Sequence, residues 1–189
     1  MVAKLFGELG CLVIHSDDAV SRAYRDPEIL NQLRQWWGDD AFNPDGQINR
    51  RVIAAKIFTD PGQRQRLEQL LHPWVARQRE QQMALDANNP KFSAFVWDTP
   101  LLFEAGLAGN CDAIVYINAP FDLRQQRVSA RQGWNRDELI RREKLQWPLD
   151  KKQKMSEYVI ENTADAEFAR GQVRDVLSRI LARKLPQQA

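Results

Sequence analysis

The chain has 189 residues, of which 43% are hydrophobic and 28% charged. That length and balance are typical of one globular domain that buries a core. The formal net charge of +2 is too small to indicate a nucleic-acid-binding protein. No apolar run approaches the about 20 residues of a membrane span, and the N-terminus has no signal-peptide pattern. We therefore predict a cytoplasmic protein, a monomer or weak oligomer, that binds neither nucleic acid nor membranes.

The charge is unevenly distributed along the chain. Residues 123–154 contain ten Lys/Arg and four Asp/Glu, a net charge of +6, so the rest of the chain carries −4. A basic segment on a near-neutral protein suits a small anionic ligand. The alternative is a solvated helix face, which is the usual role of arginine-rich helices.

The apolar pattern predicts strands alternating with helices. Val2, Leu5, Phe6 and Leu9 recur at helical spacing before Gly10, which indicates a first helix that ends at the glycine. Short apolar runs predict strands over residues 11–14, 92–97, 113–117 and 158–160.

Helix starts are signalled by Asp-Pro pairs. Asp26-Pro27 and Asp60-Pro61 each place a capping side chain before a proline that fits the first helical position. Further helices are predicted over residues 121–132, 136–146 and 165–183. Alternation of this kind favours an α/β fold, a parallel sheet flanked by helices, over residues 1–189 as a single domain.

Five segments, in chain order, resemble dephospho-coenzyme A kinases. They are Val2-Ala3-Lys4-Leu5-Phe6 with Val13-Ile14-His15-Ser16-Asp17, Asp45-Gly46-Gln47-Ile48-Asn49-Arg50, Leu70-Leu71-His72-Pro73, Asp98-Thr99-Pro100-Leu101-Leu102-Phe103-Glu104, and Tyr158-Val159-Ile160-Glu161-Asn162. Their common order and spacing make the resemblance specific. It implies a P-loop NTPase-like α/β fold with a helical acceptor-binding insertion over about residues 19–90 and a lid over about residues 123–150.

The resemblance also implies the reaction. The family transfers the γ-phosphoryl group of ATP to the ribose 3′-hydroxyl of dephospho-coenzyme A, the last step of coenzyme A biosynthesis, with Mg²⁺ as cofactor. ATP and dephospho-coenzyme A are therefore the expected partners. Such transfer depends mostly on positioning and charge neutralisation.

The sequence departs from the family pattern in two places. The family's leading strand and its Gly-x-x-x-x-Gly-Lys-Ser/Thr loop are absent from the 189 residues, and His15 stands where the first Asp of an Asp-x-Asp is expected. Because that loop supplies the lysine and amides that hold ATP and the hydroxyl that holds Mg²⁺, we expect this chain to be inactive. Two hypotheses follow: a truncated enzyme, or a pseudo-kinase that binds coenzyme A-like ligands.

Asp17 is the predicted catalytic residue, matching the second Asp of the Asp-x-Asp. It follows a strand, where α/β sheets place ligand-binding groups, and would orient or deprotonate the 3′-hydroxyl. The alternative role is a helix cap, which we assign to Asp18, and a one-residue slip would exchange the two. Asp98 ends another strand and is predicted to hold Mg²⁺ through water; alternatively, it is a turn residue before Pro100.

The remaining site residues are assigned from the resemblance. Arginines in the lid would bind the ATP phosphates, since guanidinium groups bind phosphate oxygens bidentately. These lid residues are Arg127, Arg131 and Arg141, with Arg142 replacing Arg141 if the alignment slips by one. Asn162 would contact adenine after the last strand. The acceptor site would comprise Arg50, Pro100, Leu101 and Glu104, although Arg50 equally suits an electrostatic helix cap.

Overall fold

The computed structural model describes residues 1–129, 135–163 and 165–184. The chain divides into two compact units, each described here by itself. The sheet unit comprises Met1–Val13, Lys91–Val96 and Pro100–Ala189, and the helical unit comprises Ile14–Pro90 and Trp97–Thr99. Among the described residues, no helix combines the length and apolar character needed to cross a membrane.

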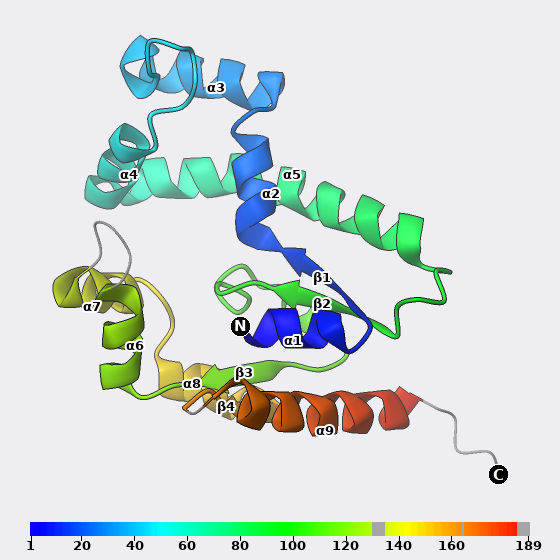
Figure 1. The fold of residues 1–189 in the computed structure, drawn as a ribbon. Coiled ribbons are helices and arrows are strands. Elements are labelled where there is room, and N and C mark those ends of the chain that lie inside the picture. Colours follow the sequence, from blue (N-terminus) through cyan, green and yellow to red (C-terminus); the bar gives the residue numbers. More distant parts are fainter. Residues whose placement is uncertain (130–134, 164, 185–189) are drawn as a thin grey trace. The chain divides into compact units, whose positions relative to one another are not determined.

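Four strands occur in the described chain, and they form two pairs (Figure 1). The strands are β1 (Cys11–His15), β2 (Ala94–Asp98), β3 (Val115–Asn118) and β4 (Tyr158–Glu161). β1 pairs with β2, and β3 runs parallel to β4 with Val115 opposite Tyr158. The sequence predicted one parallel sheet. In the structure this sheet is divided in two: among the described residues, backbone hydrogen bonds join the strands within each pair and do not join one pair to the other.

Helices cover these strands. Those of the sheet unit are α1 (Val2–Glu8), α6 (Phe121–Ser129), α7 (Arg136–Lys144), α8 (Leu149–Lys154) and α9 (Ala166–Lys184), with a short 3₁₀ turn η2 (Ala108–Asn110). α9 packs against both α1 and β4. One buried cluster holds these elements together, and it comprises Val2, Leu5, Phe6, Cys11, Tyr158, Ile160, Ala169, Val173, Val176 and Leu177. Residues of both strand pairs thus share one core.

The predicted strands were found within two residues at each end, and one difference has a visible cause. β3 was expected from residue 113 but begins at Val115. The carboxylate of Glu157 accepts a hydrogen bond from the Ile114 backbone N–H at 2.8 Å. A side chain therefore satisfies the backbone where the ladder would otherwise begin.

The helical unit consists mainly of four helices packed around a second core. They are α2 (Ser16–Ala23), α3 (Pro27–Trp37), α4 (Arg50–Thr59) and α5 (Pro61–Asp86), with a 3₁₀ turn η1 (Asp39–Ala41). α5 packs against α2 and α4. The buried core residues are Ala23, Ile29, Leu33, Trp37, Ala41, Ile48, Ile53, Leu67 and Leu71.

The Asp-Pro helix starts are confirmed. Asp26 Oδ1 accepts the Glu28 N–H at 2.9 Å, and Asp60 Oδ1 accepts the Gly62 N–H at 2.8 Å. Asp26 does more than cap α3, because its Oδ2 accepts the indole N–H of Trp74 at 2.9 Å and so joins α3 to α5. That indole bond, with the cap bonds, lowers the pKa of Asp26.

Candidate functional site

Polar side chains meet at the carboxyl ends of β1 and β2, in the helical unit. Asp98 Oδ2 accepts a hydrogen bond from His15 Nδ1 at 2.8 Å. The next residues along each strand also touch, with Ser16 Oγ 2.6 Å from Thr99 Oγ1. His15 therefore fills the position of the expected aspartate and is held by a carboxylate. Both members of the pair are about half exposed, at 46% and 47% of their side-chain surface.

Asp17 and Asp18 both lie in the first turn of α2, and both are exposed. The assignment of Asp18 as the helix cap was wrong. α2 begins at Ser16, so His15 occupies the cap position, and no side chain makes a cap bond there. Within the described residues, neither carboxylate has a hydrogen bond or ion pair. Asp17 thus has a carboxylate that is available to a ligand, and so has its neighbour.

The predicted metal role of Asp98 remains a prediction. Within the described parts of the chain, no three His, Cys, Asp or Glu side chains are grouped as ligands for a metal ion. One oxygen of Asp98 is taken by His15. Carboxylate oxygens suit Mg²⁺, which commonly keeps several waters and uses one or two carboxylates. Asp98 therefore fits contact through water better than a closed protein site.

Arg50 is the first residue of α4, and its guanidinium lies 5.5 Å from the centre of the Tyr24 ring. The alternative of an electrostatic cap is not supported, because a cation near a helix N-terminus opposes the helix dipole. The cap is instead Asn49, whose Oδ1 accepts the Val52 N–H at 3.3 Å. Arg50 is exposed, and its predicted contact with the acceptor remains to be tested.

The arginines of the predicted lid, in the sheet unit, differ in their surroundings. Arg127 is exposed on α6, whereas Arg131 lies outside the described residues. Arg141 donates from Nε and Nη2 to the carboxylate of Glu138, at 2.7 and 2.8 Å. Arg142 Nε donates to the same carboxylate at 2.6 Å. The two guanidinium groups lower the pKa of Glu138 to about 2. A phosphate that binds Arg141 must therefore compete with Glu138.

An ion pair joins the two helices of the predicted lid. Arg124 of α6 lies 3.0 Å from a Glu143 oxygen on α7, and also donates to the Ala119 carbonyl at 3.0 Å. From the sequence, this basic segment suited either phosphate-binding arginines or a solvated helix face. The structure separates Arg124, which joins the two helices, and Arg141 and Arg142, which pair within α7, from Arg127, which has no ion pair among the described residues.

Asn162 follows β4 and is half-buried. Its backbone N–H donates to the Asn118 carbonyl at 2.7 Å, which continues the β3–β4 ladder. Its side-chain Oδ1 is buried without a hydrogen-bond partner among the described residues. The predicted contact with adenine stays untested.

The loop after β2 carries the remaining residues that were predicted to bind the acceptor, and its ends are anchored. Pro100 and Leu101 are exposed, but Glu104 is only 14% exposed. Glu104 Oε1 lies 2.8 Å from Lys152 Nζ and accepts the Trp147 N–H at 2.7 Å. Burial opposes ionisation, yet these two bonds outweigh it and lower the pKa of Glu104. The structure thus gives Glu104 a full set of protein partners on that oxygen.

Lys152 is the residue that sequence reasoning missed. It was counted as one of many charges in a basic segment, yet it is 6% exposed. Lys151 and Lys154 on the same helix are exposed. No local pattern separates these lysines, because the partner of Lys152 is remote in sequence.

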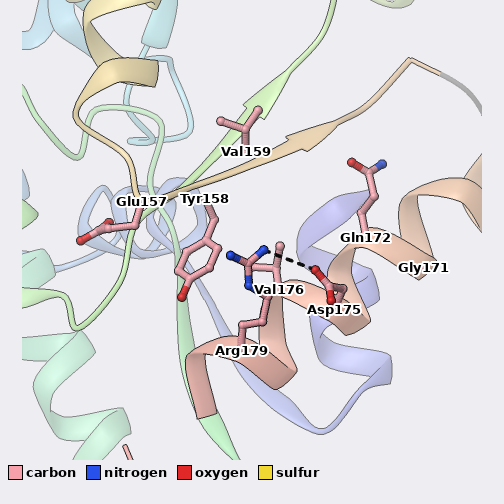
Figure 2. Close-up of a pocket in the computed structure, with 8 residues that line it drawn as sticks. All are labelled: Glu157, Tyr158, Val159, Gly171, Gln172, Asp175, Val176 and Arg179. Carbon is pink, nitrogen blue, oxygen red and sulfur yellow. Dashed lines mark ion pairs between the residues drawn. The ribbon is translucent and has the colours of Figure 1, made fainter. Parts of the chain in front are cut away.

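A hollow of about 430 Å³ lies in the sheet unit between β4 and α9 (Figure 2). It is lined by Glu157, Tyr158, Val159, Gly171, Gln172, Asp175, Val176 and Arg179. On the α9 side, Arg179 pairs with Asp175, one turn away on the same helix, at 3.6 Å (Figure 2). Of the predicted site residues that the structure describes, none lines this hollow.

Comparison with known proteins identifies the family. The family described as dephospho-CoA kinase matches residues 1–167. The dephospho-CoA kinase of Anaeromyxobacter dehalogenans is 33% identical over 97% of this chain and 89% of its own length. That of Corynebacterium efficiens is 33% identical over 96% and 91%. The expected absence of a first strand and P-loop is not confirmed, since the family match starts at residue 1.

Solved structures agree with these sequence matches. The crystal structure of TT1252 from Thermus thermophilus superposes with a TM-score of 0.81 at 30% identity, covering 97% of this chain and 90% of that one. The dephospho-CoA kinase of Campylobacter jejuni, at 23% identity and a TM-score of 0.64, shares the fold. The predicted α/β fold with parallel strands flanked by helices is confirmed. With a family match over residues 1–167 and a relative 33% identical across nearly all of both chains, this chain belongs to the dephospho-CoA kinase family.

Proposed function

We propose that the chain takes part in the family's reaction, transfer of the ATP γ-phosphoryl group to the ribose 3′-hydroxyl of dephospho-coenzyme A. The reaction completes coenzyme A biosynthesis. The family match over residues 1–167 carries this proposal. The geometry supports it, because carboxylates follow β1 and β2 at the edge where α/β folds bind ligands.

Asp17 is the proposed acceptor-activating residue. Its carboxylate is exposed at the start of α2 and lacks a protein partner among the described residues. The 3′-hydroxyl loses a proton as it attacks phosphorus, and a positioned carboxylate that accepts this proton typically contributes about 10²–10⁴-fold. His15, held by Asp98, keeps its other ring nitrogen available to neighbouring groups.

Cations are proposed to neutralise the transferring phosphoryl group. Arg127 and Arg141 are the described lid residues for this role, with Arg131 beyond the described part. Arg50 in the helical unit, and Pro100 and Leu101 in the sheet unit, are the proposed acceptor contacts. Asn162 would meet adenine.

Mg²⁺ would be held by ATP phosphates and, through water, by Asp17 and Asp98. When bound, the ion neutralises charge on the phosphate oxygens during transfer. The exposed carboxylates fit that role, since they are hard oxygen donors at the carboxyl ends of the strands.

The alternative function is that of a pseudo-kinase. Non-catalytic binding of coenzyme A-like ligands would need only the acceptor residues. The two functions differ in turnover and agree in acceptor binding.

The experiment measures both properties on the 189-residue chain. Calorimetric titration with dephospho-coenzyme A reports binding, and mass spectrometry follows coenzyme A formation after Mg-ATP is added. We expect saturable binding, with turnover below the about 1–100 s⁻¹ of typical kinases. Turnover within that range overturns the expected low activity, and binding without any turnover favours the second function. Absence of both binding and turnover overturns the proposed function.

A further inference from the structure

Lys152 stands out among the described residues, because it is one of two charged side chains that are buried, at 6% exposure. A lysine ammonium has three protons to donate and accepts no hydrogen bond. Three oxygens surround Nζ: Glu104 Oε1 at 2.8 Å, the Pro100 carbonyl at 3.0 Å and Gln146 Oε1 at 2.9 Å. Every proton of the buried ammonium therefore has an acceptor.

These oxygens come from two segments of the sheet unit that are distant in sequence. Pro100 and Glu104 belong to the loop after β2, whereas Gln146 lies between α7 and α8. The same junction is closed by the Trp147 N–H, which donates to Glu104 at 2.7 Å. The rings of Phe103 and Trp147 stack at 5.7 Å with an interplanar angle of 11°. Lys152 is thus the charged centre of a packed junction.

The arrangement pins both ends of the loop. The Pro100 carbonyl and the Glu104 carboxylate bind the same ammonium, while Leu101 between them keeps 37% of its surface exposed. A loop that is fixed at its ends and exposed in its middle presents that middle in one orientation. Gln146 binds the ammonium as well and lies two residues beyond the end of α7. The position of the loop is therefore tied to the segment that leaves the lid helix.

Stability alone is a weak explanation for such an ion pair. Replacing a buried pair with apolar residues of similar volume is often neutral or stabilising, because the desolvation penalty offsets the attraction. A role in positioning the loop fits the three acceptors better, because each hydrogen bond from the ammonium fixes the direction of one acceptor as well as balancing charge.

We propose that Lys152 is a positioning residue that fixes the acceptor loop Pro100–Glu104 against the end of the lid and couples the two. The proposal rests on the proposed function, because the loop is assigned to the acceptor through it. Coupling of this kind is reciprocal. A ligand that shifts the position of the segment after α7 changes the affinity for the acceptor, and acceptor binding changes the affinity for that ligand by the same factor.

The test compares Lys152→Met with Lys154→Met. Lys154 is a matched control, because it lies on the same helix, is 80% exposed and pairs at the surface with Asp150. Each variant is titrated with dephospho-coenzyme A well below its melting temperature. Hydrogen exchange is measured at the amides of residues 101–105 and at those of β3 and β4.

We expect Lys152→Met to weaken dephospho-coenzyme A binding about tenfold, within the usual range of site coupling, and to speed amide exchange in the loop but not in the strands. Lys154→Met should change neither. Wild-type affinity and exchange in a folded Lys152→Met protein would overturn the proposal. A different result is possible, in which the wild type fails to bind dephospho-coenzyme A but Lys152→Met still speeds amide exchange in the loop. That result would overturn the proposed function, whereas the role of Lys152 in fixing the loop would stand.

A second variant covers the case in which Lys152→Met does not fold. Gln146→Leu removes one neutral acceptor and keeps the Lys152–Glu104 pair. It should weaken acceptor binding about two- to fivefold, as expected for one hydrogen bond of about 0.5–1 kcal/mol, and unchanged binding would again overturn the proposal.

Discussion

Replacing Glu138 with glutamine should strengthen ATP binding, if Arg141 is a phosphate ligand. In the structure Glu138 holds Arg141 at 2.7 and 2.8 Å and Arg142 at 2.6 Å. A phosphate must break at least the first contact. Exposed helical pairs of this kind change an equilibrium only about twofold each. Glu138→Gln should therefore lower the dissociation constant for ATP about two- to fourfold, the upper value applying if both arginines are released.

The assay is a calorimetric titration of ATP against the wild type, Glu138→Gln and Asp137→Asn. Asp137 is the matched control, because it lies in the first turn of the same helix and its replacement removes the same charge. It makes no described bond to either arginine. Equal effects of the two variants would mean that general charge, not release of Arg141, governs affinity. Weaker binding by Glu138→Gln would refute the reasoning, since Glu138 would then orient Arg141 for the phosphate.

Three further predictions follow from the described contacts. In a form that turns over, Asp17→Asn should lower turnover about 10²–10⁴-fold with little change in acceptor binding, and Asp18→Asn should not; the reverse pattern places the active carboxylate one residue on. Glu104→Gln should lower the free energy of unfolding by about 3–5 kcal/mol, because it leaves a buried ammonium without its counter-charge. The folded pKa of Glu104 lies below its ordinary value of 4.5, so the stability that its carboxylate contributes is present above pH 4.5 and is lost as the pH falls below that value. The melting temperatures at pH 7 and pH 4 should therefore differ less in Glu104→Gln than in the wild type. Arg79 is 6% exposed, lies 3.9 Å over the Trp97 ring and has a buried Nε without an acceptor among the described residues; urea unfolding should show Arg79→Met within about 1 kcal/mol of wild type, and a loss above about 2 kcal/mol in that variant would reveal a stabilising partner.

Local signals in the sequence predicted much of the fold. The Asp-Pro pairs at Asp26 and Asp60 gave correct helix starts, because capping uses bonds within a few residues. Apolar runs located every described strand for a similar reason. The end of β1 ahead of Asp17 was recognised, but the helix was expected to start later than Ser16. His15 carries no side-chain cap signal, so the sequence offered no cue to the true boundary.

The remaining features depend on partners that are distant in the chain. His15 meets Asp98, and Lys152 meets Glu104. Neither pairing has a periodicity, and nothing in the basic segment distinguishes the buried lysine from its exposed neighbours. The division of the sheet into two strand pairs likewise depends on which strands hydrogen-bond to each other, and these strands are distant in sequence. Such contacts follow from the tertiary arrangement and were beyond a reading of local pattern.

Acceptor binding is the property on which the whole account depends, and calorimetric titration of the 189-residue chain with dephospho-coenzyme A measures it directly. The account predicts one saturable site with a dissociation constant in the usual substrate range of about 1 μM to 1 mM. It also predicts weaker binding by Arg50→Met, because Arg50 is an exposed guanidinium without an ion pair among the described residues, and unchanged binding by the exposed control Arg51→Met. A titration that shows no saturable heat at millimolar dephospho-coenzyme A would contradict it.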